Sequence, residues 1–422
     1  MRVLISGAGI AGPTLAWFLA KTGAQITILE KSKALFPHGQ NVDIQGSAVE
    51  IIRRMGLLDE VRRRNTTEKG TQFVGPDGLP FASFPLTDGC AASPTSPYEI
   101  MRGDLAAILY EATRNLSGVH YLFDTTIKNV VANGRESVIV ELNNGEKRAY
   151  DLLVAADGQW SKVRQQSFAP ASVQVSHMGM YAVYYTIPRI SDDNQMWNIF
   201  VGLKSRILAI RPDPYGTCRA MLTFMPRSSA QDESWREATR QGRKVQSALL
   251  REEFVDAGWQ THRLLNTMDA APDFYFHVIE QIKMSKWSEG RVICLGDAAY
   301  APTPLTGMGT SLAIVGAYML AGELSELRDG EYPTTAFETY EDKFRPFVEE
   351  SQIIPPFVPA IMHPDRSWKR WILHSVISAT ASVVALPWIA KRMRDPSSVE
   401  DFPLPNYGTL KDRRHDLQDR DG

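Results

Sequence analysis

The sequence predicts an α/β protein in which a domain built on a parallel sheet is interrupted by an inserted antiparallel sheet. Three observations support this prediction. An apolar strand at residues 3–5 runs into a glycine-rich turn and then a helix, as at the start of a doubly wound fold. Short strand-like runs separated by turn residues follow over 178–225. An apolar strand at 291–295 then returns the chain to the first sheet.

Composition and charge are those of an ordinary globular protein. The 422 residues include 46 basic and 48 acidic ones, and the net charge of −2 gives no reason to expect nucleic-acid binding. The widely separated Cys90, Cys218 and Cys294 favour a reducing compartment over a disulfide framework. We also predict no metal site, because no histidine–cysteine cluster has ligand spacing. The N-terminus lacks signal-peptide features, so we expect a cytoplasmic protein.

Local patterns predict the individual elements. The expected helices are 13–22, 47–55, 103–114 and several within 234–258. The strands expected in the inserted sheet are 179–187, 196–201, 207–211 and 218–225. The turn Asn143-Asn144-Gly145 predicts a hairpin between strand 138–142 and the apolar run 150–155. Residues 74–98, rich in Gly, Pro and Ser, suggest a connection or an edge element.

The first motif is the turn after the first strand. Gly7 permits a tight turn, Gly9 lets the backbone approach a pyrophosphate, and Gly12 lets the helix pack closely on the strand. The helix N-terminus that begins near Ala11 offers free N–H groups to an anion. Glu30 ends the second strand, where its carboxylate can accept hydrogen bonds from a ribose. Together these features predict a Rossmann-like domain that binds either NAD or FAD.

Two further motifs each follow an apolar strand. The first is Asp157-Gly158, at the end of the strand 151–156. The second begins at Gly296-Asp297 and runs to Ser311. A carboxylate at such a strand end can accept a hydrogen bond from a ribityl hydroxyl. Gly307 and Gly309 leave space where a flat ring must approach the backbone, and helix N–H groups can then stabilise a reduced, anionic flavin.

In this order the three motifs resemble those of the group A flavoprotein monooxygenases, the aromatic-hydroxylase family that includes p-hydroxybenzoate hydroxylase and the tetracycline-degrading monooxygenases. The resemblance covers residues 1–345. It implies an oxidoreductase that binds FAD and is reduced by NADH or NADPH. It would insert one atom of O2, through a flavin carbon-4a hydroperoxide, into an aromatic or polyketide-like small molecule of secondary metabolism.

Motifs and resemblance together give the expected FAD contacts. These are Gly7, Gly9, Ala11, Gly12, Glu30, Lys31, Asp43, Arg102, Asp157, Gly158, Asp297, Pro304, Gly307, Met308, Gly309 and Thr310. By resemblance alone, Asp157 serves both FAD and the nicotinamide cofactor, Arg102 contacts FAD, and Asp43 lies beside the isoalloxazine ring. The alternative for Arg102 is a solvated arginine at a helix start.

The sequence departs from the family pattern at Tyr300, where many members have histidine, and at Met308 and Thr310, where many have glutamine and asparagine. No substrate is therefore carried over from the better-known members.

The resemblance also divides the chain. We expect residues 1–72, 98–170 and 285–345 to form the FAD-binding domain, residues 73–97 and 171–284 the substrate-binding domain, and residues 346–422 a C-terminal helical segment with a charged, disordered tail. A side chain on the inserted sheet that deprotonates a phenol would help catalysis. The candidates by residue type are His177, Tyr181, Tyr185, Trp197 and Arg206, although an aromatic residue on a strand more often packs in a core.

Residues 371–390 have the length of a membrane span, carry no charged side chain, and are flanked by basic pairs. Their several polar residues favour a helix packed on the protein, with peripheral membrane contact as the alternative.

Other functions stay open or are excluded. Baeyer–Villiger insertion, epoxidation, and oxidase or dehydrogenase activity without oxygen insertion remain alternatives on the same fold, as does a flavoprotein carrier or redox sensor. A nucleophile elbow, a Walker loop and the tryptophan signature of flavin halogenases are all missing from the sequence. The sequence predicts no oligomeric state.

Overall fold

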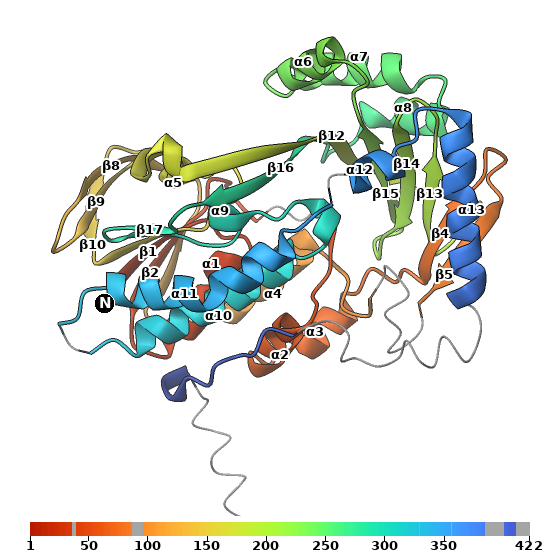
Figure 1. The fold of residues 1–422 in the computed structure, drawn as a ribbon. Helices are drawn as coiled ribbons and strands as arrows, with labels where there is room; N and C mark the ends of the chain where they lie inside the picture. Colours follow the sequence, from red (N-terminus) through yellow and green to blue (C-terminus); the bar gives the residue numbers. More distant parts are fainter. Residues whose placement is uncertain (36–38, 87–95, 329, 356, 385–400, 411–422) are drawn as a thin grey trace, which may run out of the picture.

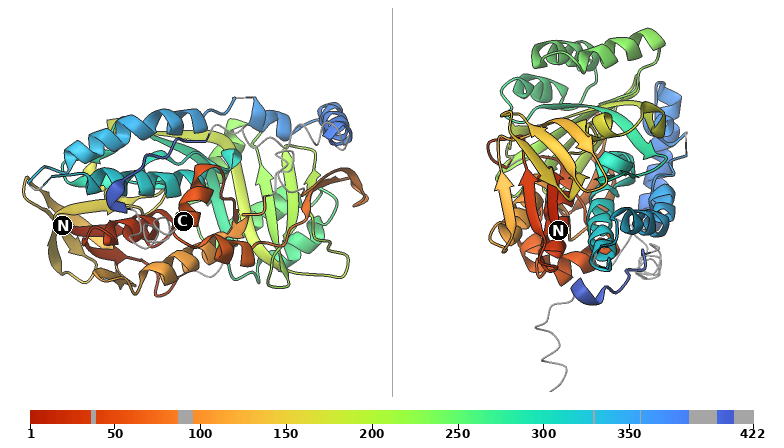
Figure 2. Two further views of the ribbon diagram at one scale, coloured as in Figure 1. Left: turned by 90° about the horizontal axis from the view of Figure 1, so that it is seen from below. Right: turned by 90° about the vertical axis from the view of Figure 1, so that its left-hand side faces the viewer.

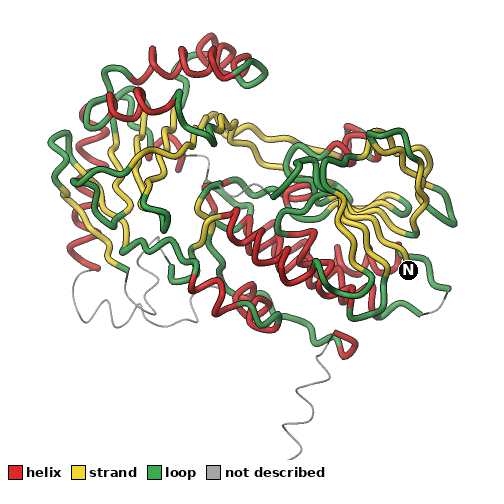
Figure 3. The backbone as a smooth tube through the Cα atoms, turned by 180° about the vertical axis from the view of Figure 1, so that it is seen from behind, coloured by secondary structure: helices red, strands yellow, loops and turns green. Residues whose placement is uncertain are grey.

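The computed structural model describes residues 1–35, 39–86, 96–328, 330–355, 357–384 and 401–410. Two sheets lie side by side, and two long strands, β12 and β16, run from one lobe to the other (Figure 1). The same pair is visible from behind as two continuous strands that link the lobes (Figure 3). The chain is thus a mixed α/β protein, as predicted.

The first lobe is built on a six-stranded sheet in the order β17-β18-β11-β1-β2-β7, parallel except for β17. Its strands are β1 (Arg2–Ser6), β2 (Gln25–Leu29), β7 (Val119–Leu122), β11 (Leu152–Ala155), β17 (Ser288–Glu289) and β18 (Val292–Cys294). Strands β1, β11 and β18 are almost continuously apolar because both faces of this sheet are covered. The predicted return of the chain at 291–295 is confirmed by β18.

Helices cover one side of this sheet, and a three-stranded antiparallel meander lies on the other (Figure 2). The meander consists of β8 (Ile127–Asn133), β9 (Val138–Leu142) and β10 (Lys147–Tyr150). The helices of this lobe are α1 (Ala11–Ala20), α2 (Ser47–Arg54), α3 (Leu58–Arg63), α4 (Arg102–Thr113), α5 (Lys162–Ser167), α9 (Asp297–Tyr300), α10 (Gly309–Ser325) and α11 (Thr334–Ser351). The helices predicted at 13–22, 47–55 and 103–114 are confirmed.

The hairpin prediction needs one correction. The turn at 143–145 does follow β9, but the returning strand is β10, at 147–150, and not the run 150–155. Residues 152–155 instead form β11 and pair in parallel with β1. A fully apolar strand buries more apolar surface in a sheet that is covered on both faces than in a hairpin with one face in solvent.

The second lobe is a seven-stranded sheet in the order β16-β12-β15-β14-β13-β4-β5. Its strands are β4 (Gly70–Val74), β5 (Pro80–Pro85), β12 (Val173–Pro188), β13 (Trp197–Val201), β14 (Arg206–Pro212), β15 (Thr217–Phe224) and β16 (Tyr275–Met284). The four strands predicted within 178–225 are confirmed. The sheet is not purely antiparallel, however, because β4 arrives from a distant stretch of chain and pairs in parallel with β13. Residues 80–85 form the edge strand expected within 74–98, of which 87–95 lie outside the described residues.

The two faces of this sheet are covered differently. Helices α6 (Ser229–Ala238), α7 (Arg243–Phe254) and α8 (Thr261–Met268) pack on one face, where they enclose Val183, Leu222 and Leu208. The helices expected within 234–258 are therefore confirmed. The opposite face meets the first lobe and, farther out, helices α12 (Val358–Met362) and α13 (Ser367–Val384).

Helix α13 contains the described part of the uncharged segment 371–390, while 385–390 lie outside the described residues. Its Leu373 and Ala381 are buried against Phe73 and Ile199 of the sheet. The expectation of a helix packed on the protein is thus confirmed for 371–384. Among the helices that the structure describes, none combines the length and apolar character needed to cross a bilayer.

Two short segments complete the described chain. Strands β3 (Asn41–Val42) and β6 (Ile100–Met101) pair between the lobes. Residues 401–410 run back over the first lobe, where Tyr407 is buried and its hydroxyl donates to Glu323 Oε1 of α10 at 2.5 Å. The charged tail predicted from Lys411 onward lies outside the described residues.

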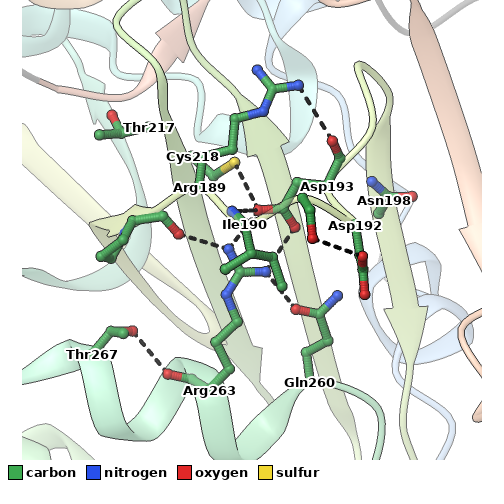
Figure 4. Close-up of polar contacts among 12 residues, drawn as sticks. Arg189, Ile190, Asp192, Asp193, Asn198, Thr217, Cys218, Gln260, Arg263 and Thr267 are labelled. Carbon is green, nitrogen blue, oxygen red and sulfur yellow. Dashed lines mark hydrogen bonds and ion pairs between the residues drawn. The ribbon is translucent and has the colours of Figure 1, made fainter.

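An ion pair fixes the loop between β12 and β13 to helix α8 (Figure 4). Arg263 donates from Nη1 to Asp193 Oδ1 at 2.7 Å and from Nη2 to Asp193 Oδ2 at 2.6 Å. Arg263 Nη2 also donates to the carbonyl oxygen of Pro188 at 2.7 Å. The Asp193 side chain is only 5% exposed, so this bidentate pair is largely shielded from water.

We predict that Arg263→Met lowers the free energy of unfolding by about 3 kcal/mol, because the Asp193 carboxylate would stay buried without its cation. Urea unfolding of the flavin-loaded protein measures the change. Arg236→Met is the matched control: its pair with Asp232 is solvent-exposed, with 53% of the arginine side chain accessible, and should contribute less than about 1 kcal/mol. Equal losses in the two variants would contradict the prediction.

Candidate functional site

The candidate site begins at the carboxyl ends of four parallel strands. Gly7 follows β1, Glu30 follows β2, Asp157 follows β11 and Asp297 follows β18. These strands are neighbours in the sheet, so the four positions line one edge. Open α/β sheets bind their ligands at this edge, where the strand order reverses around the first strand.

The glycine turn has the geometry that a pyrophosphate requires. A Cβ on Gly7, which has φ +116°, would clash with the carbonyl oxygen of Ala156, and one on Gly12 would clash with the carbonyl oxygen of Gly7. A Cβ on Gly9 would meet nothing within 4 Å. Two glycines therefore serve internal packing, while Gly9 leaves open space at the N-terminus of α1, where an anion is favoured.

Glu30 lies directly beside this turn. Its Oε2 accepts from the backbone N–H of Ala8 at 3.3 Å, and its Oε1 accepts from the N–H of Ser32 at 3.0 Å. These contacts hold the carboxylate at the end of β2, next to the turn. Lys31 follows it, with its side chain in solvent.

Asp157 carries an unsatisfied acceptor. Its Oδ2 accepts from the backbone N–H of Lys162 at 3.0 Å, whereas its buried Oδ1 has no protein partner. Burial raises the pKa of this carboxyl, and hydrogen bonds from Ser161 and the start of α5 oppose the shift. A buried acceptor without a partner is expected to have one in the ligand-bound protein. Gly158, at φ +83°, turns the chain there.

Asp297 and Arg102 lie close enough for their charges to interact. Burial raises the pKa of Asp297, and the positive charge of Arg102 opposes that rise. A Cβ on Gly309 would lie 3.7 Å from Asp297 Oδ1, so the start of α10 faces this carboxylate closely. Arg102 begins α4 with an exposed side chain, and its backbone N–H donates to the carbonyl oxygen of Gln40 at 2.9 Å.

The loop from Thr303 to Gly309 adopts unusual backbone angles. Thr303 has φ +82° and a buried hydroxyl oxygen without a partner, and Gly307 has φ +67°. A positive φ at a threonine is strained, and such strain gathers at ligand sites. Pro304 opens a short 3₁₀ turn in this loop, and Met308 is the N-cap of α10.

Asp43 lies opposite this loop. Its Oδ2 accepts from Gln45 Nε2 at 2.8 Å, and a Cβ on Gly307 would lie 3.8 Å from that same nitrogen. The backbone N–H of Gln45 donates to Ser311 Oγ at 2.9 Å. The 41–44 segment and the late glycine loop, which are far apart in sequence, therefore meet at one place.

The substitution at Tyr300 has a structural reason. Tyr300 is 1% exposed, and its hydroxyl lies 2.9 Å from that of Tyr340 on α11. A Cβ on Gly316 would clash with the Tyr300 hydroxyl. The ring therefore points into the helix layer and away from the strand edge. Thr310 is also buried, at 8% exposure, in the first turn of α10.

Four of the five catalytic candidates on the inserted sheet contact the helical side of the second lobe. The Tyr181 hydroxyl donates to Asp232 Oδ1 at 2.9 Å and the Tyr185 hydroxyl donates to Leu264 O at 3.0 Å, both on the helix-covered face. Arg206 donates to Asp256 Oδ1 at 2.5 Å, and His177 lies 3.3 Å from Asp232. The structure does not bring these four side chains together with Asp297 and Arg102.

Trp197 alone among the candidates lies on the other face, stacked under Arg211 at 4.1 Å. Arg211 forms a buried ion pair with Glu68, Nε to Oε2 at 2.8 Å, and a second with Glu99. Burial, with Arg211 opposing it, raises the pKa of Glu99 to about 7. This buried charge cluster lies close to Asp43, whose charge also raises the pKa of Glu99.

Two residues that the sequence did not single out face the strand edge. Tyr275 and His277 are two residues apart on β16 and therefore lie on the same face of the sheet. The Tyr275 hydroxyl is 3.0 Å from His277 Nδ1. Burial, with a smaller contribution from Arg102, lowers the pKa of His277 to about 4. Burial raises the pKa of Tyr275, opposed by Arg102 and supported by Asp297. Their only sequence signal was a strand-like run, and the sheet register decides which way they face.

Comparison with known proteins identifies this arrangement. Residues 1–352 match a family model described as an FAD binding domain. The chain is 32% identical, over 97% of its length and 99% of the relative's, to the FAD-dependent monooxygenase asL4 of Sarocladium schorii. The chain belongs to the group A flavoprotein monooxygenases.

This FAD-dependent monooxygenase has further relatives of the same kind. It is 35% identical to monooxygenase CTB7 of Cercospora beticola over 89% of the chain and 90% of that protein. Among solved structures, the tetracycline destructase Tet(55) matches with a TM-score of 0.77 and 29% identity over 96% of this chain and 98% of that one. Klebsiella pneumoniae HpxO, solved with FAD and uric acid, shares the fold at a TM-score of 0.69 and 20% identity, over 93% of this chain and 96% of that one.

The strand edge suits the cofactor of this monooxygenase family. The open space at Gly9, the unpartnered Asp157 Oδ1 and the Asp297 carboxylate beside Gly309 lie along one edge, in the order of the predicted motifs. FAD is a long ligand, and it needs an anion site and a glycine-lined ring site at separate ends.

We predict that Gly9→Ala folds normally but loses FAD affinity about tenfold or more, because its new methyl group would take space only from the pyrophosphate. FAD absorbance after dialysis and the circular-dichroism spectrum measure the two effects. Gly242→Ala is the control, since a Cβ there also meets nothing within 4 Å but lies far from the turn. Gly12→Ala should disturb folding as well. Full FAD retention by Gly9→Ala would refute the assignment.

Proposed function

We propose that this FAD-dependent monooxygenase uses NADH or NADPH to insert one atom of molecular oxygen into an aromatic or polyketide-like small molecule of secondary metabolism. The observation that carries the proposal is the position of the late glycine loop. Just before this loop, the carbonyl of Ala301 accepts from the Ile282 N–H of β16 and that of Pro302 accepts from Gln281 Nε2 at 3.4 Å. One face of the β12–β16 pair carries an apolar cluster in which Met180, Ala182 and Ile279 are buried and Tyr184 packs beside them. Such a face suits a flat, apolar substrate.

In this proposal one lobe binds the cofactor and the other binds the substrate. Residues 1–72, 98–170 and 285–345 would hold FAD, and residues 73–97 and 171–284 would hold the substrate. In this proposal Gly7, Gly9, Ala11 and Gly12 bind the pyrophosphate, and Glu30 binds the adenosine ribose. The 29% identity to a tetracycline destructase supports a polycyclic substrate of that chemical kind.

The flavin-ring end would be bound by other residues. Asp297 would accept from the ribityl chain, and the positive charge of Arg102 opposes the rise in its pKa that burial causes. The backbone from Pro304 through Met308 and Gly309 to Thr310 would face the isoalloxazine ring, with Asp43 across from it. Asp157 would use its free Oδ1 on FAD or on the nicotinamide cofactor. When bound, FAD supplies the hydride acceptor and the oxygen-transfer chemistry that no side chain provides.

A hydrogen-bonded pair on β16 would polarise the hydroxyl group of a phenolic substrate. Burial and Arg102 lower the pKa of His277 to about 4, which favours the neutral ring, so its Nδ1 can accept a hydrogen bond from the Tyr275 hydroxyl at 3.0 Å. Burial raises the pKa of Tyr275, so its hydroxyl keeps its proton and remains a hydrogen-bond donor to His277. A substrate hydroxyl that donates to the Tyr275 oxygen would be polarised through this pair.

Isotope labelling tests the oxygen insertion. With a candidate polycyclic phenol we expect substrate-stimulated NAD(P)H oxidation and one labelled atom in the product from ¹⁸O2. An unlabelled product would instead support the oxidase or dehydrogenase alternative. A labelled ester or epoxide would support Baeyer–Villiger insertion or epoxidation, the second candidate on this fold.

We predict that Tyr275→Phe lowers substrate oxygenation about 10- to 100-fold by removing the hydroxyl that His277 orients. FAD content and NAD(P)H oxidation without substrate should not change. Tyr181→Phe, which removes a hydroxyl from the helix-covered face, should leave oxygenation within about twofold. Product formation per turnover measures both variants, and the reverse pattern would favour the candidates named from the sequence.

A further inference from the structure

Helix α13 is apolar on the side that faces away from the protein as well as on the side that packs. Its inner side chains, Leu373 and Ala381, lie against the seven-stranded sheet. Its outer side chains are exposed by 57% at Trp368, 70% at Trp371, 45% at Ile372, 58% at Val376 and 48% at Val383. We call these five residues the outer face of α13.

This outer face is unusual for a helix on a protein surface. Such helices normally place charged residues opposite the buried stripe. Between Arg370 and the last described helical residue, Val384, α13 has no charged side chain. Ile361 of the neighbouring helix α12 is 53% exposed as well and extends the apolar surface. Large exposed apolar patches mark interaction sites.

Basic side chains outnumber acidic ones at this surface. Arg366, Lys369 and Arg370 stand at the start of α13, and Arg366 is 73% exposed. The described residues 366–384 contain no acidic residue, and their basic residues are Arg366, Lys369 and Arg370. Asp365, just before the helix, pairs with Lys369, Nζ to Oδ1 at 2.6 Å, and more loosely with Arg366, Nε to Oδ2 at 3.8 Å, so this end of the helix keeps a net positive charge. A partner for this surface must therefore supply negative charge together with apolar surface.

We propose that the outer face of α13 docks the enzyme on an anionic lipid surface. Two tryptophans beside a basic cluster at one end of an uncharged stripe are the arrangement found in helices that lie in the membrane interface. The basic residues would bind lipid headgroups, each contributing to affinity near an anionic surface. A second copy of this chain fits less well, because its own copy of this face would bring a further net positive charge: its Asp365 already pairs with Lys369 and Arg366.

The position of α13 agrees with attachment parallel to a bilayer. The helix stands at the outer end of the second lobe, on the side away from the six-stranded sheet (Figure 1). Its inner side is held by the sheet, so the helix can insert its outer side chains without leaving the protein. Docking by insertion of single side chains needs no helix that spans the bilayer.

Vesicle sedimentation of the full-length, FAD-loaded protein tests the proposal. We expect the protein to sediment with vesicles of phosphatidylcholine mixed with phosphatidylserine, and much less with phosphatidylcholine alone. Added salt should weaken binding to the mixed vesicles. Failure of the wild-type protein to bind the anionic vesicles would overturn the proposal.

Two double variants separate the apolar and charged contributions. Trp368→Ser with Trp371→Ser should lower the partition coefficient about tenfold or more by removing the inserted rings. Arg366→Gln with Lys369→Gln should lower it by about 25-fold on anionic vesicles, about fivefold for each cation, and leave binding to phosphatidylcholine unchanged. Val255→Ser, at a residue that is 54% exposed beyond the end of α7, is the matched control and should bind like the wild type.

Sedimentation velocity tests the alternative, in which the outer face of α13 binds a second copy of this chain. All variants should keep their FAD and remain in the same oligomeric state as the wild type. A wild-type dimer that the tryptophan variant loses would make this face a self-association interface and overturn the proposal. Vesicle binding by the tryptophan variant equal to that of the wild type would also overturn it. Both readouts are independent of any substrate, so they do not depend on the proposed reaction.

Discussion

The pairing of β12 with β16 is the constraint on which both lobes depend. These strands stay hydrogen-bonded from Val173↔Met284 at the first lobe to Tyr184↔Tyr275 in the second, with one register shift between His177 and Tyr181. Because side chains alternate along a strand, this register decides which residues face the FAD edge and which face the helices. A register shift of one residue would turn His277 and Tyr275 to the opposite face of the sheet and remove this proposed hydrogen-bonded pair from the site.

The cofactor end of the protein could be predicted from the sequence because its signals are local. A glycine turn between a strand and a helix, or a carboxylate at a strand end, is specified within a few residues. The parallel sheet then brings those strand ends together, as at Gly7, Asp157 and Asp297. The family match over residues 1–352 agrees with this interpretation. The hairpin error at 150–155 arose because the turn was recognised locally while the competing parallel partner, β1, was distant.

The proposed substrate end could not be predicted in the same way because its signals are long-range. Tyr181 and Tyr185 were named by residue type, but only pairing with β15 and β16 shows that they point at α6 and α8. Tyr275 and His277 lie about 90 residues further along the chain and had no motif of their own. The parallel pairing of β4 with β13 likewise joins segments that no local pattern connects.

The contact between Tyr300 and Gly316 has an evolutionary consequence. The tyrosine hydroxyl occupies the space that a side chain at position 316 would need. Neither residue can therefore be exchanged alone without cost: a larger residue at 316 expels the ring, and a smaller one at 300 leaves a void among Trp287, Tyr340 and Phe344. Among relatives of this enzyme, positions 300 and 316 should therefore change together, and those with tyrosine at 300 should have glycine at 316.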